Sequence, residues 1–379
     1  MREGLSPERQ REARRLATRR RLLFLGQLVL GVVYLLAITL SGTAARLRDG
    51  VAGLPGGTGG TVAAYFLVLW VVYSILSFPF SLVGGWTLPR SYGLSVQTLG
   101  QWLVDWLKGE GIGLVLGLAV VQVTYALLRV TPEFWWLIAG VLYLTFVVIL
   151  AQVGPVLLLP LFFKLTPLDR PELAERLLAL ARQAGTRIQG IYRLNLSAKT
   201  TAANAMLAGL GRTRRVILGD TLLDSYTPAE IEVVFAHELG HQVHHDIPTL
   251  IVGQAAVTLV ALYLANLALV AGARAFDYRG IADVATMPLL ALVLGAVGVI
   301  TTPLVNWVSR RMERRADCYA IETTRAPAAF KSTMIHLANQ NLAVYRPATW
   351  IEVLFYDHPS IAQRVDLAER FERDGRCGG

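Results

Sequence analysis

Hydrophobic residues in this chain are gathered into six long runs without a charged side chain. The runs cover residues 22–40, 61–84, 111–128, 134–163, 247–271 and 286–308. About 20 apolar residues in a helix cross the hydrocarbon core of a bilayer, so each run is long enough for a span. The fourth run exceeds that length and contains Pro155 and Pro160, which predict a span followed by a broken or interfacial piece. We therefore expect a mostly α-helical, polytopic membrane protein.

Polar segments between these runs divide the chain into five predicted parts. They are a basic arm at 1–21, four spans within 22–163 with a loop at 85–110, a polar segment at 164–246, two spans within 247–308 and a final segment at 309–379. Neither 164–246 nor 309–379 has the size of an ordinary independent enzyme domain. We expect these two segments to pack together, over or between the spans.

The segment at 164–246 contains the signals of a small β-sheet and two helices. Periodicity predicts one helix over 172–184, which ends before Gly185. Thr227 followed by Pro228 and Glu230 predicts the start of a second helix, which we expect to run through residue 245. The predicted strands are 187–195, 204–208 and 214–218, with a turn at 209–211.

Composition and charge agree with a membrane protein and indicate its orientation. Residues are 54% hydrophobic and only 17% charged, which is too few charges for a soluble chain of this length. Of the net charge of +9, residues 1–21 contribute eight Arg and three Glu. Positive charge beside the first span places the amino terminus in the cytoplasm, and six spans then place 85–110, 164–246 and 309–379 on that side. We favour an anchor over a cleaved signal at the first run, and cleavage would leave this topology unchanged.

The same features exclude a nucleic-acid-binding protein and a protein held together by a disulfide framework. The basic arm has no aromatic residues, so we expect no nucleic-acid partner. Two cysteines, Cys318 and Cys377, cannot form a disulfide framework.

The helix that begins near Thr227 contains the sequence His237-Glu238-Leu-Gly-His241. Histidines four residues apart project from one face of a helix and can bind one metal, and Glu238 lies alongside to act on the attacking water. Coincidence is the alternative, but the apolar residues at 233–236 supply the buried helix that this motif requires. The motif predicts a zinc site.

A catalytic zinc held by two histidines needs a third protein ligand. Glu313 and Asp317 lie one turn apart on a predicted helix, on the same side of the membrane as His241 by the count of spans. The spacing alone favours a different interpretation, in which both carboxylates pair with the neighbouring arginines of an exposed helix.

Several further segments resemble the type I CAAX prenyl protease family of integral-membrane zinc metallopeptidases. Together with the His-Glu-x-x-His helix they extend from about residue 61 to 370. The bias of Arg over Lys indicates a GC-rich genome, and we expect a prokaryotic member. The segments are Phe78-Pro-Phe-Ser81, Tyr92 to Thr98, Asn204-Ala-Met, Gly211 to Leu223, Ser309 to Asp317 and His358-Pro-Ser360.

This resemblance implies roles for residues that the spacing leaves open. It makes Glu313 the third ligand of one zinc ion per chain, and Asp317 a residue that steadies a ligand. It further implies that Asn204 binds substrate backbone from an edge strand, that His358 stabilises the oxyanion and that Arg364 contacts substrate. From the residues alone, His358 before Pro359 is interpreted as a helix start.

The chain also departs from the family pattern near the predicted site. Met206 stands where an aromatic residue is usual, and Gln242 stands where tryptophan is common. Just before Asn204, where the family usually has a histidine, this chain has Ala202 and Ala203. These changes leave the ligand set intact and bear on substrate preference. We interpret His244 and His245 as helix-end residues and not as ligands, because neither repeats the one-turn spacing from His241.

The sequence as a whole predicts a zinc metalloendopeptidase that cleaves membrane-associated or prenylated-type proteins or peptides. We expect a small β-sheet in its cytoplasmic portion and, in a prokaryote, residence in the inner membrane. Two alternatives stay open, namely a transporter without peptidase activity and an inactive scaffold with structural zinc. The absence of charge within the spans disfavours the transporter.

Overall fold

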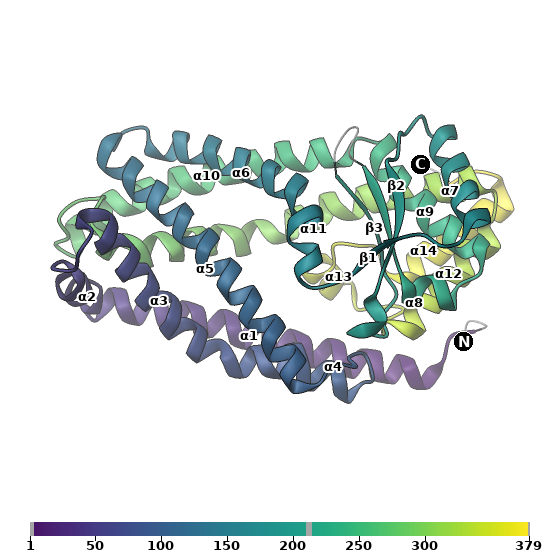
Figure 1. The fold of residues 1–379 in the computed structure, drawn as a ribbon, viewed down its shortest axis with the longest axis horizontal. Helices are drawn as coiled ribbons and strands as arrows, with labels where there is room; N and C mark the ends of the chain where they lie inside the picture. The colour runs from purple at the N-terminus through teal and green to yellow at the C-terminus, as the bar shows by residue number, and fades with distance from the viewer. Residues whose placement is uncertain (1–3, 210–213, 378–379) are drawn as a thin grey trace.

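The structure is a computed structural model, and it describes residues 4–209 and 214–377. It is elongated, with long helices over most of its length and a smaller mixed α/β portion at one end (Figure 1). The turn predicted at 209–211 falls mostly outside the described residues.

The prediction of six spans is confirmed. In the described part of the chain, six helical segments are long and apolar enough to cross a membrane. Their helices are α1 (Pro7–Leu40), α3 (Gly57–Leu82), α5 (Leu99–Val130), α6 (Trp135–Leu157), α10 (Asp246–Ala275) and α11 (Met287–Thr324).

Two spans differ in detail from the hydrophobic pattern. Helix α5 begins at Leu99, because Thr98 and Gln101 form a capping box there, so the second half of the predicted loop at 85–110 is helical. The first half contains a π-helical turn (Val83–Thr87) and α4 (Leu88–Ser91). The fourth apolar run divides into α6 and a short 3₁₀ helix (Leu159–Leu161), as its prolines predicted.

The basic arm is the first part of α1 and contacts the far end of the chain. The Gln10 side chain donates to the Ala343 carbonyl at 3.0 Å and accepts from the Tyr345 amide at 2.9 Å. Leu16 is buried in the same cluster as Leu342. The amino terminus and the mixed portion therefore lie at the same end of the molecule (Figure 1).

At the opposite end, α2 (Thr43–Val51) and the 3₁₀ helix Val284–Thr286 connect the spans. Arg48, which is partly buried, forms an ion pair of 2.6 Å with the buried Asp283 across this end. Arg48 joins α2 to the loop before α11, so the ends of α1, α3 and α11 are held together there.

The small sheet has four strands in the order β1-β2-β4-β3. Strands β2 and β4 are parallel and the other two pairs are antiparallel, which leaves β3 as an edge strand. The three-residue β1 is too short to have a sequence signal. The strands are β1 (Leu165–Pro167), β2 (Gly190–Leu194), β3 (Ala205–Ala208) and β4 (Arg215–Gly219).

The segments that precede and follow the last two spans in the sequence share one hydrophobic core beside the sheet. Val233 and Ala236 pack with Ile321, Phe330 and Val365 in one buried cluster. The helices here are α7 (Pro171–Gln183), α8 (Asp220–Ser225), α9 (Pro228–Val243), α12 (Pro327–Gln340), α13 (Thr349–Phe355) and α14 (Ile361–Asp374). Helix α9 ends two residues before the predicted residue 245, because His245 adopts a left-handed conformation with φ of 55°.

Candidate metal centre

Helix α9 presents its two histidines to one point. Its first turn is fixed by the capping box of Thr227 and Glu230, and Ser332 of α12 also donates to Glu230 at 2.7 Å. The rings of His237 and His241 lie 4.9 Å apart between centroids and are nearly perpendicular. The one-turn spacing of the sequence therefore produces the expected pair of imidazoles on one face.

Glu313 of α11 completes a group of three possible ligands with these histidines. One carboxylate oxygen lies 3.3 Å from Nε2 of His237 and the other lies 3.3 Å from Nε2 of His241. One ligand atom from each of the three residues lies within 4.8 Å of the others. Two segments separated by two membrane spans thus meet at one point.

The close approach of α11 to α9 depends on Gly240. A Cβ atom at this position would lie 2.9 Å from the Cα of Ala316, which is shorter than real Cβ contacts allow. Gly240 precedes His241, and Ala316 lies one turn after Glu313. The glycine in the His-Glu-x-x-His motif therefore lets the helices come near enough for Glu313 to reach both rings.

The second nitrogen of each ring is bonded to a buried carboxylate. Nδ1 of His237 lies 2.9 Å from Asp317, and Nδ1 of His241 lies 2.8 Å from Asp246. In a neutral imidazole, a proton on Nδ1 leaves the Nε2 lone pair free. Both Nε2 lone pairs then point at the Glu313 carboxylate, which is the arrangement that carboxylate partners impose on histidine ligands.

This arrangement fits a metal ion. Oε2 of Glu313 is buried and has no hydrogen-bond partner among the residues that the structure describes. Three electron-pair donors facing one another repel unless a cation lies between them. Two imidazole nitrogens and one carboxylate are a donor set that catalytic zinc takes, with one position left for water.

Electrostatics at the centre also favour a cation. Burial lowers the pKa of His237, but the Asp317 and Glu313 carboxylates more than offset this effect and raise the pKa to about 9. The pKa of His241 is likewise raised against the effect of burial by Glu313 and Asp246. In the metal-free protein the positively charged, protonated forms of His237 and His241 are therefore stabilised. A metal ion would replace those protons.

Two arginines hold the supporting carboxylates. The Arg364 guanidinium forms two hydrogen bonds to Asp317, of 2.8 Å and 2.5 Å, and is only 9% exposed. Arg315 lies 2.6 Å from Asp246. In the structure the Arg364 guanidinium is hydrogen-bonded to Asp317. Its predicted contact with substrate stays a prediction.

Glu238 lies between the centre and the free edge of the sheet. Its carboxylate accepts a hydrogen bond of 3.3 Å from the amide of Leu207 in β3. Asn204 directly precedes this strand, with an exposed side chain and a carbonyl that accepts from the Gly219 amide at 2.9 Å. The structure therefore brings the predicted edge strand next to the predicted base.

His358 lies on the loop before α14, with its side chain 51% exposed. Nε2 is 3.3 Å from Glu313 and Nδ1 is 2.8 Å from Asp357. The helix itself begins at Ile361 with Ser360 as its cap, so His358 precedes the helix start and faces the centre.

Sequence reasoning missed Asp246 and Arg315. Asp246 follows the two histidines that we interpreted as helix-end residues, and Arg315 is one of the arginines beside Glu313 and Asp317. One signal could have revealed Asp246. A histidine ligand generally needs a hydrogen-bond partner on its other ring nitrogen, so His241 requires a carboxylate of its own beside the Asp317 that serves His237. His244 is the cap of α9 and lies outside the ligand group.

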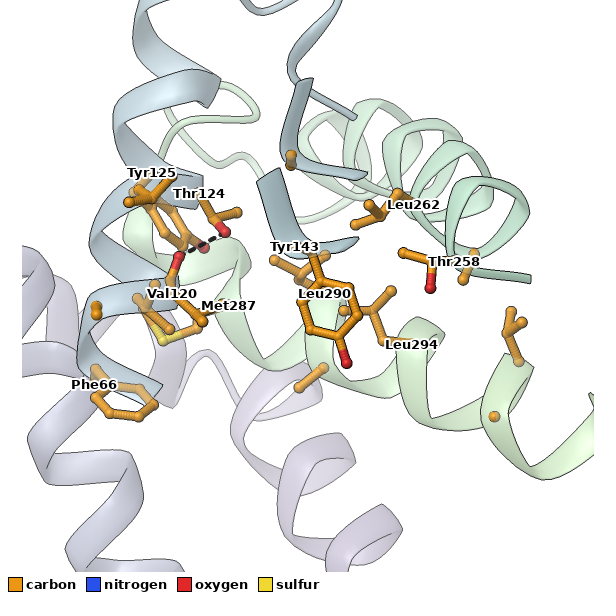
Figure 2. Close-up of a pocket in the computed structure, with 18 of the residues that line it drawn as sticks. Phe66, Val120, Thr124, Tyr125, Tyr143, Thr258, Leu262, Met287, Leu290 and Leu294 are labelled. Atoms are coloured by element: carbon orange, nitrogen blue, oxygen red, sulfur yellow. Dashed lines mark hydrogen bonds between the residues drawn. The ribbon is translucent and has the colours of Figure 1, made fainter. Parts of the chain in front are cut away.

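A cavity of about 790 Å³ lies among the spans. Its wall is mostly apolar, with Phe66, Tyr143 and Leu290 drawn around it from three different helices (Figure 2). Gln254 also lines it, eight residues after Asp246 on α10, or about 12 Å along the helix. The cavity thus lies within the bundle and begins within two to three turns of the centre.

Two family descriptions match nearly the whole chain. Peptidase family M48 matches residues 167–372, and the CAAX prenyl protease N-terminal family, described as five membrane helices, matches residues 2–164. Within described residues 4–164 the structure has four helices long and apolar enough to span, α1, α3, α5 and α6.

Individual proteins and one solved structure are also similar. The chain is 31% identical to the uncharacterized metalloprotease YhfN of Bacillus subtilis, over 81% of this chain and 73% of that protein. It is 26% identical to CAAX prenyl protease 1 of Saccharomyces cerevisiae, over 77% and 68% of the two chains. The crystal structure of S. mikatae Ste24p has the same fold, with a TM-score of 0.84 over 97% of this chain and 90% of that chain at 19% identity. With the His-Glu-x-x-His helix and its third carboxylate, these matches show that the chain belongs to peptidase family M48 and is an integral-membrane metallopeptidase.

Proposed function

We propose that the centre binds one zinc ion per chain through His237, His241 and Glu313, and that it hydrolyses peptide bonds. The observation that carries this proposal is the convergence of three ligand atoms whose orientation is fixed by Asp317 and Asp246. Zinc in such a site supplies a Lewis acid for the scissile carbonyl and lowers the pKa of water.

Glu238 is the residue that moves the proton. It follows His237 directly, and its carboxylate is only partly buried. In the proposed reaction it accepts a proton from the attacking water and donates it to the leaving amine. Its hydrogen bond to the Leu207 amide holds it beside the strand where substrate is expected.

His358 is placed to stabilise developing negative charge. Its Nε2 faces Glu313 at 3.3 Å, and its Nδ1 is bonded to Asp357. A protonated Nε2 is a donor for the oxyanion that forms when water attacks the carbonyl. Because its side chain is 51% exposed, the ring is proposed to turn from Glu313 toward the substrate carbonyl when substrate binds.

Substrate is proposed to bind as an additional strand along β3. The edge of β3 that faces away from β4 carries the backbone groups of Ala205 and Leu207, and Asn204 stands at its start. An extended peptide can pair with such an edge through main-chain hydrogen bonds. Arg364 is proposed to contact substrate here, in addition to holding Asp317 on His237. Met206 and Gln242 lie where the family pattern differs, so the preference among peptides is expected to differ as well.

The proposed substrates are membrane-associated proteins or peptides, which include lipidated ones. Relatives of this chain are named CAAX prenyl proteases, and the centre lies at the end of two membrane helices, α10 and α11. The arginine-rich start of α1 packs at the same end of the molecule as the centre, which supports a cytoplasmic orientation by the positive-inside rule. In a prokaryote this membrane is the inner membrane.

The test compares purified wild type with Glu238→Gln. Zinc is measured in each, and peptide fragments are identified by mass spectrometry after incubation with a membrane proteome. We expect one zinc per chain in both proteins and new fragments only with wild type. Zinc in both with identical fragments would favour an inactive scaffold or a transporter.

A further inference from the structure

A second pocket lies beside the centre, where α11 leaves the apolar part of the bundle. Its volume is about 750 Å³, and its wall contains four arginines and one carboxylate. The arginines are Arg310, Arg311, Arg314 and Arg315, and the carboxylate is Glu352 of α13, whose side chain is buried and accepts from the Ser360 amide. The pocket therefore has a strongly positive wall.

One face of α11 passes from apolar to aromatic to basic residues. Leu304 and Trp307 are 58% and 46% exposed, and Arg311 and Arg314 follow on the same face. The Arg311 guanidinium lies over the Trp307 ring at 4.0 Å from its centroid. Tryptophan is enriched at the membrane interface, and the two arginines lie about 6 and 10 Å further along the helix, at the depth of lipid headgroups.

Helix α13 lies at the same depth, beside α11 at the border of the bundle (Figure 1). Asn306 donates to the carbonyl of Leu354 at 3.0 Å, and Phe355 packs edge-on against Phe24, near the start of the first apolar run. Trp350, Val353 and Leu354 are 61%, 44% and 41% exposed on this short helix. Exposed apolar residues at this depth are explained if α13 rests in the membrane surface.

We propose that this pocket binds the phosphate of an anionic membrane lipid, with Arg311 and Arg314 as the residues that contact it. Arginine binds phosphate oxygens through paired N–H donors, and the apolar face of α13 lies beside the acyl chains. Arg310 has a different role, since it donates to the carbonyls of Glu352 and Tyr356 and so fixes α13 to α11.

The bound lipid would lie next to the loop that carries His358. It would also lie next to Arg315, which supports one of the proposed metal ligands through Asp246. Pro359 lines the pocket and follows His358 directly. Arg315 lines it too, and holds Asp246 on His241. The site is therefore positioned to steady both sides of the centre, although binding itself does not depend on the peptidase reaction.

The test measures lipid binding to the full chain by native mass spectrometry, from detergent micelles with equal phosphatidylglycerol and phosphatidylcholine. We expect wild type to retain phosphatidylglycerol preferentially. The Arg311→Gln/Arg314→Gln variant should retain roughly 10- to 30-fold less, the factor expected from removing two arginines at an anionic surface. Arg311→Lys/Arg314→Lys, which keeps the charge, should retain most of the binding.

The matched control is Arg370→Gln/Arg373→Gln, because these exposed arginines have the same spacing on α14 and the same charge change. Equal retention of phosphatidylglycerol by this control and by the Arg311→Gln/Arg314→Gln variant would overturn the proposal. Inorganic phosphate forms a second arm. If phosphate alone at millimolar concentration displaces the lipid from wild type, the pocket is a site for free phosphate and the lipid assignment is wrong.

Discussion

Gly240→Ala tests whether the contact between α9 and α11 sets the geometry of the metal centre. The added Cβ would lie 2.9 Å from the Cα and 3.2 Å from the carbonyl oxygen of Ala316, where ordinary contacts are 3.4–4 Å. The obstructing Cα and carbonyl are backbone atoms of a long helix, so rotation of a side chain cannot relieve the clash. The helices must separate by roughly 0.5–1 Å, given the spacing of close-packed carbon atoms.

A separation of this size exceeds what the metal site tolerates. Ligand distances around zinc hold within about 0.2 Å, and Glu313 lies one turn before Ala316 on the displaced helix. Overpacking of this kind costs about 1–3 kcal/mol, which over most of that range exceeds the gain of about 1 kcal/mol that alanine brings over glycine within a helix. We therefore expect lower thermal stability, zinc below one per chain and loss of most peptidase activity.

The assay measures zinc by elemental analysis after dialysis, together with the melting temperature and cleavage of a peptide substrate. Gly253→Ala on α10 is the control, because a Cβ there meets nothing within 4 Å. That variant should match or slightly exceed wild type in stability and retain its zinc. The reasoning is refuted if Gly240→Ala binds zinc fully and melts as high as the control.

Three further predictions concern the same centre. Glu238→Gln should retain zinc and lose cleavage by at least about 100-fold, since it removes the proton acceptor alone; full activity would exclude Glu238 as the base. Asp246→Ala should lower zinc affinity by about 10- to 100-fold in competition with a chelator, whereas Asp374→Ala, at the exposed end of α14, should not. In the metal-free protein the pKa of His237 is raised from 6.5 to about 9, so its protonated ring stabilises the fold fully below pH 6.5, and this contribution is lost as pH rises through 9. Melting in chelator should therefore show a loss of up to about 3 kcal/mol over that pH range, and an equal loss in His237→Gln would show that other groups cause it.

Asp246 illustrates why part of the centre could not be predicted. A continuous helix through residue 245 would turn the fifth residue after His241 away from the histidine face. The chain instead breaks at His244 and His245, and the left-handed conformation of His245 redirects α10. This break brings Asp246 back to Nδ1 of His241.

The basic arm at 1–21 shows the same limit on a larger scale. Its charge predicted an orientation, and charge beside a span is a local property of the sequence. Its contacts with 342–345 bridge the two ends of the chain, and no local pattern at either end announces them.

The sequence by itself determined the six spans and the placement of His237, Glu238 and His241 on one helix. These follow from apolar length and from the 3.6-residue period, which are local properties. Only the tertiary structure decided that Glu313 faces both rings while Asp317 supports one of them, because the two carboxylates lie on one helix and spacing treats them alike. The choice depends on how α11 is rotated and how closely it approaches α9 at Gly240. That is a long-range packing contact between two segments that two membrane spans separate in the sequence.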